Sequence, residues 1–156
     1  MIYYKYIRTG RGAVFMFSGE QTHQLDGKNR IRIPAKFKSE TSEKLVFCKG
    51  ITPCIFVYPK SVYEQMAIKF SEISMFDAEA NEALSVFMSS FSAVEEDNQG
   101  RIVLPQSLKE YAGIDKNVVT VGVFNRLEIW SEERRKEIET GKSFAEQMKI
   151  LSSRVK

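Results

Sequence analysis

The sequence has few residues that bind metal ions and no apolar run long enough to span a membrane. Its 156 residues include one histidine, His23, and two cysteines, Cys48 and Cys54. A structural zinc site would therefore need carboxylates to complete its usual four ligands. No apolar run approaches the roughly 20 residues of a membrane span, and the N-terminus lacks the apolar core of a signal peptide. Because both cysteines lie in apolar runs, we read them as small hydrophobic residues of a reducing compartment.

The sequence also lacks the residue patterns of an enzyme. There is no glycine-rich phosphate loop, and the scattered carboxylates do not identify an acid/base pair. We interpret His23 as a strand residue and not as a catalytic base. The expectation is a cytoplasmic protein that is not an enzyme, with no metal, no other cofactor, no small-molecule substrate and no membrane partner.

Basic charge is concentrated at one end of the chain. The net charge of +3 is too small by itself to indicate nucleic acid. Residues 1–38, however, hold eight basic and two acidic side chains, whereas the other 118 residues hold fifteen basic and eighteen acidic ones. The first 38 residues therefore contain the candidate surface for an anionic partner.

The apolar pattern predicts a mixture of strands and helices. Residues 30–33 alternate polar and apolar, as in a strand with one solvated face, and residues 45–48 and 54–58 form a predicted hairpin. Asp77 is a predicted helix cap, and Ser143 with Glu146 forms a predicted capping box. We expect the two middle helices to pack on the sheet or on each other, mostly as core. Their apolar stripes are Val62, Met66 and Phe70 in the first, and Leu84, Phe87, Met88 and Phe91 in the second.

An internal repeat is the most informative feature of the sequence. Residues 26–34 and 97–105 share Asp, Arg, Ile and Pro at an offset of 71, and the offset becomes 72 in the later strands. Each copy is predicted to contain a strand, a tight loop, a second strand, a short helix and a hairpin. A one-residue change of offset is what an insertion in a loop produces.

The loop that begins each repeated segment has a locally specified shape. The carboxylates of Asp26 and Asp97 can accept backbone N–H groups within the turn. The fourth loop position holds Asn29 or Gly100, residue types that readily adopt a left-handed backbone conformation. We therefore predict that Asp26, Asn29, Asp97 and Gly100 structure two equivalent loops.

Basic residues follow the first loop at every second position. In an extended segment Lys28, Arg30 and Arg32 would share one face, which Lys36 and Lys38 would extend. Such a face fits phosphate, although a merely solvated strand face is the alternative. Along its own strand Arg101 has only Gln99 and Val103 beside it. If the partner is DNA, we therefore expect the first repeat to lead in binding it, and Arg101 to serve mainly as a structural partner of Asp97.

The chain resembles the MraZ family in specific motifs. The first lies in residues 16–34, around His23, Leu25, Asp26, Lys28 and Arg30; the second lies in residues 97–131. Within the second, residues 111–114 read Tyr-Ala-Gly-Ile and residues 128–131 read Glu-Ile-Trp-Ser. The resemblance covers roughly residues 16–130. One departure is Asn29, which stands where the family usually has glycine.

The resemblance implies a fold and a function. The implied fold is α+β and mainly β, a swapped-hairpin, double-psi-like barrel built from two AbrB-like half-domains plus packed helices. The implied function is transcriptional regulation by a nucleoid-associated, ring-forming homo-oligomer that binds direct repeats in double-stranded DNA upstream of the division and cell-wall gene cluster. The candidate DNA-binding residues are then Lys28, Arg30, Arg32, Lys36 and Arg101. The alternative function is a ring-forming structural or antitoxin-like protein that binds DNA only incidentally.

Five segments make up the expected organisation of the chain. An N-terminal extension at 1–15 precedes the first AbrB-like repeat at 16–60, a helical connector at 61–92, the second repeat at 93–130 and a helical tail at 131–156. Two interpretations of the extension stay open. It is an over-called start of the gene, which we favour, or a basic arm that contacts DNA through Lys5, Arg8 and Arg11. The tail is either an oligomer contact or a frayed end.

Overall fold

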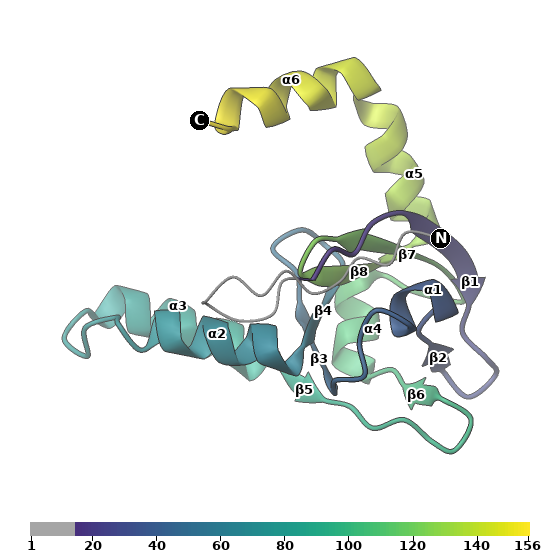
Figure 1. The fold of residues 1–156 in the computed structure, drawn as a ribbon, viewed down its shortest axis with the longest axis horizontal. Helices are drawn as coiled ribbons and strands as arrows, with labels where there is room; N and C mark the ends of the chain where they lie inside the picture. Colours follow the sequence, from purple (N-terminus) through teal and green to yellow (C-terminus); the bar gives the residue numbers. More distant parts are fainter. Residues whose placement is uncertain (1–14) are drawn as a thin grey trace.

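A mainly antiparallel six-stranded sheet forms the centre of the protein. The computed structural model describes residues 15–156, so the N-terminal basic residues considered above lie outside the described part. The strand order is β1-β7-β8-β4-β3-β5, and a separate two-stranded ribbon pairs β2 with β6 (Figure 1). The strands are β1 (Glu20–Gln24), β2 (Arg30–Arg32), β3 (Leu45–Lys49), β4 (Ile55–Pro59), β5 (Ser92–Ala93), β6 (Arg101–Val103), β7 (Asn117–Val123) and β8 (Arg126–Ser131). The expected α+β class is confirmed.

The two halves of the chain exchange their first strands. The predicted hairpin is confirmed, because β3 pairs with β4, and β7 and β8 form its counterpart in the second half. β1 pairs with the second hairpin through β7, while β5 pairs with the first through β3. β4 and β8 join the two hairpins side by side. Each hairpin is therefore completed by a strand from the other half, which makes the two halves one folding unit.

The β2–β6 ribbon lies on a local pseudo-twofold axis. Its register pairs Arg30 with Val103, Ile31 with Ile102, and Arg32 with Arg101. Rotation about the central isoleucine pair carries each residue of β2 onto the residue 71 positions later, so the strand register reproduces the sequence offset. Ile31 and Ile102 are buried, which fixes one face of the ribbon to the core and directs the other face to solvent.

Short helices follow both ribbon strands. α1 (Ala35–Lys38) begins after Pro34, and α4 (Gln106–Ala112) begins after Pro105, where proline fixes the backbone at the helix start. Phe37 of α1 and Leu108 of α4 are buried in the common core. These helices therefore anchor the ribbon to the body from its two ends.

The two middle helices form an antiparallel hairpin that projects from the body (Figure 1). They are α2 (Lys60–Phe70) and α3 (Ala78–Ser89), and Asp77 caps α3 as predicted by accepting the N–H of Ala80. The helices pack on each other through Phe70 and Phe87, whose ring centroids are 6.0 Å apart. The expectation that the stripe is mostly core is confirmed only in part: Phe87 and Phe91 pack against the core, but no residue of α3 is fully buried and Leu84 and Met88 line an open groove. Two helices beyond the edge of the sheet lack a third layer to cover them.

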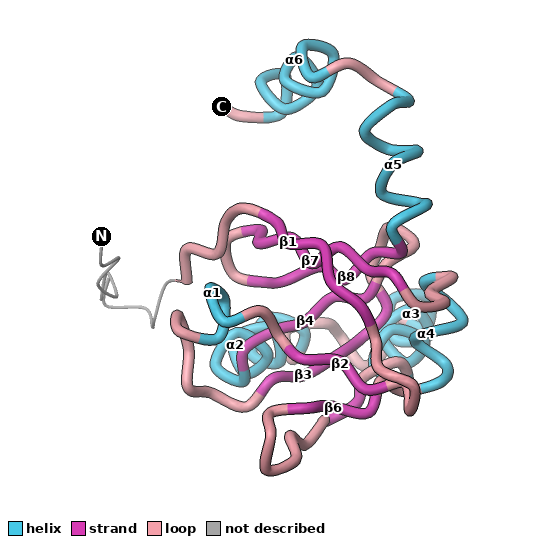
Figure 2. Tube along the Cα trace, turned by 90° about the vertical axis from the view of Figure 1, so that its right-hand side faces the viewer, coloured by secondary structure: helices cyan, strands magenta, loops and turns pink. Residues whose placement is uncertain are grey.

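Two further helices form an arm at the C-terminal end. α5 (Glu132–Gly141) packs on β7 and β8, and α6 (Phe144–Arg154) extends away from the body, at the end opposite to the ribbon (Figure 2). The predicted cap is confirmed, because Ser143 Oγ accepts the N–H of Glu146. Among the described residues, no helix is long and apolar enough to cross a membrane.

Candidate nucleic-acid interface

Two aspartate loops with the same hydrogen bonds begin the ribbon strands. In the first, Asp26 Oδ1 accepts the N–H groups of Lys28 at 2.9 Å and Arg30 at 3.0 Å. In the second, Asp97 Oδ1 accepts the N–H groups of Gln99 at 2.8 Å and Arg101 at 2.9 Å. One carboxylate oxygen thus closes each turn, as the sequence predicts.

The fourth position of each loop has the predicted left-handed conformation. Asn29 has a φ of 56° and Gly100 a φ of 74°. A β-branched or bulky residue is strained at such angles, whereas Asn and Gly adopt them at small cost. Asn29 also contacts the neighbouring segment, because its carbonyl oxygen accepts the N–H of Leu104 and its side-chain oxygen accepts a hydrogen bond from Lys109 Nζ at 2.9 Å. The departure from the family pattern at Asn29 therefore adds a contact.

The second carboxylate oxygen of each loop holds an arginine. Arg30 Nε donates to Asp26 Oδ2, and Arg101 Nε donates to Asp97 Oδ2, each at 2.6 Å. The arginine side chains are 22% and 26% exposed. Among the described residues, neither guanidinium makes a further hydrogen bond through its Nη atoms. Each guanidinium is thus fixed on one side while its remaining donors stay available to a ligand.

Strand pairing brings a third arginine to the same surface. Arg32 lies directly opposite Arg101, so the solvent face of the ribbon combines Arg30, Arg32 and Arg101 with the exposed Val103. We call these four residues the ribbon face. Along its own strand Arg101 has no basic neighbour. Pairing with β2 supplies that neighbour, and both arginines serve equally as partners of their aspartates.

The structure places the predicted lysines in different positions. Lys28 lies in the loop and not on an extended strand, because β2 begins at Arg30. Lys36 belongs to α1, where its ammonium group donates to the Glu20 carbonyl oxygen and lies 4.9 Å from the centre of the Phe37 ring. Lys38 forms an ion pair with Glu96. The every-second-residue pattern therefore describes Arg30 and Arg32 but not Lys28.

Lys109 is a basic residue near the ribbon that the sequence argument missed. It lies on α4 and reaches the first loop through Asn29. The offset of 71 that relates the two halves makes it the counterpart of Lys38. The repeat itself was therefore the signal that would have identified it.

His23 lies where a strand residue was expected. It belongs to β1, and its Nε2 lies 2.7 Å from Thr120 Oγ1 of β7. Burial lowers the pKa of His23, because a buried environment disfavours the charged imidazolium. The neutral ring therefore links two strands of the sheet.

The loop carboxylates predict an acid-dependent loss of stability. Hydrogen bonding, chiefly from the Arg101 N–H, lowers the pKa of Asp97 to about 2, and the Arg30 N–H lowers the pKa of Asp26 in the same way. A carboxyl group with a depressed folded-state pKa stabilises the fold above its unfolded pKa, and this stabilisation is lost as the pH falls towards the folded-state pKa. We expect Asp97→Asn to lower the melting temperature at pH 7, because a neutral amide oxygen accepts the N–H groups of Gln99 and Arg101 more weakly than a carboxylate does. The difference from the unmodified chain should shrink near pH 2.

Melting curves from pH 7 to pH 2 measure this effect. Asp115→Asn is the matched control, since Asp115 is exposed and lies between α4 and β7, outside both loops. Equal melting temperatures of Asp97→Asn and the unmodified chain at every pH would show that the loop carboxylate does not stabilise the fold.

Comparison with known proteins matches both halves of the chain to the same protein family. The family model described as MraZ protein matches twice, over residues 16–86 and 87–152. The chain is 44% identical to a protein of Moorella thermoacetica over 78% of this chain and 85% of that protein. It is 43% identical to a protein of Finegoldia magna over 76% of this chain and 83% of that protein. Both relatives are named "Transcriptional regulator MraZ".

Proposed function

Because the chain belongs to the MraZ family, we propose that it is a transcription regulator that binds double-stranded promoter DNA through the ribbon face. The observation that carries this proposal is the pair of partly exposed arginines, Arg30 and Arg101, which equivalent aspartates hold in the same geometry. Arginine recognises phosphate and the guanine edge by paired hydrogen bonds, and a fixed guanidinium loses less conformational freedom on binding. The proposed activity is binding and not catalysis.

The shape of the ribbon suits the major groove. That groove is about 12 Å wide and admits a two-stranded β-ribbon as well as a helix. Arg30, Arg32 and Arg101 would face the base edges or the adjacent phosphates, while Lys28 in its loop and Lys36 on α1 would supply flanking phosphate contacts. The sequence specificity depends on which of the three arginines contacts a base and not a phosphate.

The finer fold assignment is part of this proposal. Strand exchange between the halves supports a swapped-hairpin, double-psi-like arrangement of two AbrB-like half-domains. In such an arrangement the two aspartate loops lie at opposite ends of one ribbon, so a single chain presents a complete pseudo-twofold reading surface.

We propose that copies of the chain assemble through the C-terminal arm. α6 is exposed along its apolar stripe, which consists of Phe144, Met148, Leu151 and Val155. The α2–α3 hairpin carries an apolar groove of about 270 Å³, lined mainly by Tyr63, Met66, Phe70, Leu84, Met88 and Phe91. Both surfaces would remain in water in a monomer, which is unfavourable for contiguous apolar area.

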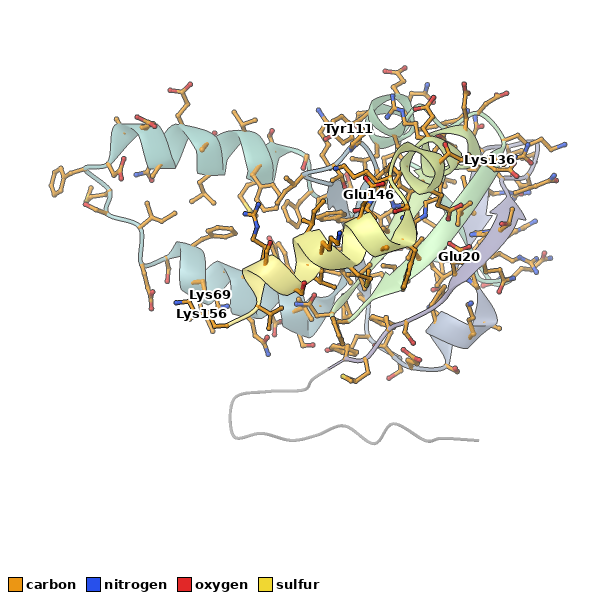
Figure 3. The ribbon with its side chains drawn as sticks, turned by 90° about the horizontal axis from the view of Figure 1, so that it is seen from above. Glu20, Lys69, Tyr111, Lys136, Glu146 and Lys156 are labelled. Atoms are coloured by element: carbon orange, nitrogen blue, oxygen red, sulfur yellow. The ribbon has the colours of Figure 1, made fainter. Side chains whose placement is uncertain are left out.

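The helices α3 and α6 carry net charges of opposite sign. α3 contains Glu79 and Glu82 and no basic residue, whereas α6 ends near Arg154 and Lys156. Figure 3 shows α6 from above, with Glu146 near its start and Lys156 at its end. A contact from α6 of one copy to the groove of the next joins unlike surfaces, and such head-to-tail contacts close into rings or continue as filaments. A ring larger than a dimer is therefore the proposed assembly.

The proposed DNA site is a set of direct repeats upstream of the division and cell-wall gene cluster, as the family resemblance implies. Such a protein would act in the cytoplasm, on the nucleoid. The ring would place several ribbon faces on neighbouring repeats, and weak single contacts would gain from effective concentration.

Salt and repeat number test the proposal together. We expect log affinity for the DNA upstream of the gene to fall linearly with log salt, by about 0.9 for each phosphate neutralised. A duplex with four repeats should bind on the order of 10²-fold or more tightly than a duplex with one. Fluorescence anisotropy across a potassium chloride series measures both quantities.

Two outcomes would contradict this picture. Equal affinity for one repeat and for four would exclude multivalent binding. Binding that is weak and the same for promoter and unrelated DNA would favour the alternative, a structural or antitoxin-like ring protein for which DNA binding is incidental.

A further inference from the structure

The pseudo-twofold symmetry of the ribbon face is broken at specific residues. Rotation about the Ile31 and Ile102 pair superposes Arg30 on Arg101, and these two arginines have the same aspartate partner and the same geometry. The same rotation superposes Arg32 on Val103. The backbone and the pair Arg30 and Arg101 therefore obey the twofold symmetry, but the pair Arg32 and Val103 does not.

The loops and helices beside the ribbon also break the symmetry, but they place the additional positive charge at the end opposite to Arg32. At the first loop, Lys28 is exposed and Lys109 contacts Asn29. At the equivalent positions of the second loop, Gln99 replaces Lys28, and Lys38 is neutralised by Glu96. Among the described residues, Lys28 and Lys109 beside the first loop have no acidic partner, whereas Lys38 beside the second loop does.

Val103 is the unexpected member of the ribbon face. Its side chain is 65% exposed, and it lies directly opposite Arg30. Valine suits a strand, but its apolar side chain gains nothing from contact with water on the solvated face of a basic ribbon. Against DNA such a side chain has one specific counterpart, because the only apolar group on a base edge in the major groove is the 5-methyl group of thymine.

We propose that the ribbon face reads DNA in a single orientation, with Val103 packed against a thymine methyl group on one side of the pseudo-twofold axis and Arg32 reading a different base on the other side. This inference rests on the proposed function and deepens it. A DNA-binding surface with true twofold symmetry binds best to a palindromic site. A surface whose symmetry is broken at Arg32 and Val103 binds best to an asymmetric site. A ring whose subunits present this surface in the same orientation fits direct repeats.

Selection from a random duplex library tests the orientation. The unmodified chain should enrich a motif whose two halves differ at the outer base pair. The variant Val103→Arg makes position 103 the same as position 32, so the enriched motif should shift towards a palindrome, with the outer thymine replaced by the base that Arg32 reads. Ile51→Arg is the matched control, because Ile51 is an exposed apolar residue in the β3–β4 turn. Its motif should equal that of the unmodified chain.

Replacement of thymine by deoxyuridine tests the methyl contact. In the selected duplex, deoxyuridine at the outer position should weaken binding by the unmodified chain roughly fourfold, the effect of one methyl group removed from water. Val103→Ala should bind both duplexes with the same, lower affinity. Deoxyuridine at thymines on the far side of the axis should have no effect.

The outcomes separate this inference from the proposed function. A palindromic motif with steep salt dependence would overturn the orientation while DNA binding by the ribbon stands. An asymmetric motif that is insensitive to deoxyuridine would overturn the role of Val103. Failure to enrich any motif, together with shallow salt dependence, would overturn the proposed function itself.

Discussion

Replacing Arg30 and Arg101 together by alanine is expected to reduce the affinity of the chain for its DNA site by roughly 30-fold to 10⁴-fold. Each bidentate arginine contact contributes about 1–3 kcal/mol, and 1.4 kcal/mol corresponds to a factor of about ten. Both guanidinium groups are held by their aspartates at 2.6 Å, so both are oriented before DNA arrives. The single variants should each lose a similar share, since their geometry is the same.

The fold should survive this double substitution. Both ion pairs are partly exposed, and exposed pairs contribute about 0–1 kcal/mol each. The backbone N–H groups at positions 30 and 101 remain to close the loops on Asp26 and Asp97. Melting temperature and oligomer mass should therefore change little while anisotropy titrations show the loss of binding.

Lys69→Ala is the matched control for removal of a basic residue. Lys69 is exposed on α2, in the projecting helical hairpin (Figure 3), and its replacement should leave DNA affinity nearly unchanged. If Arg30→Ala loses binding and Arg101→Ala keeps it, the prediction made from the sequence is correct: the first repeat leads in DNA binding and Arg101 is mainly structural. If both single variants bind normally, the ribbon face is not the DNA interface.

The second large effect is expected from charge placed on the exposed stripe of α6. Met148→Glu with Leu151→Glu should convert the assembly to smaller species, because two carboxylates would have to be buried against an apolar groove. Affinity for a four-repeat duplex should then fall by on the order of 10²- to 10⁴-fold as avidity is lost. Affinity for a single repeat should stay the same, since the ribbon is untouched.

Ser153→Glu supplies the control for this experiment. Ser153 lies on the helix face opposite to the apolar stripe, as its spacing from Met148 and Leu151 requires. It should preserve both the mass measured by light scattering and the binding of the four-repeat duplex. An unchanged mass for the double variant at micromolar concentration would exclude α6 as the subunit contact.

Local features of the fold were predictable from the sequence. The loop around Asp26 was predictable because its hydrogen bonds join residues at most four positions apart, and its left-handed position accepts few residue types. The caps of α3 and α6 were predictable for the same reason. One error concerns burial. The stripe on α3 has the spacing of a core face, but spacing does not say whether another layer covers it.

The sequence by itself determined the repeat, the two aspartate loops, the hairpins and the membership of a regulator family, since each depends on residues near one another in the chain or on direct similarity. Only the tertiary structure decided which residues share the ribbon face. The pairing of Arg32 with Arg101 joins positions 69 residues apart, and their register is set by burial of Ile31 against Ile102 in a core to which both halves contribute. Such a register depends on how the whole core packs, which no pattern within a single strand contains.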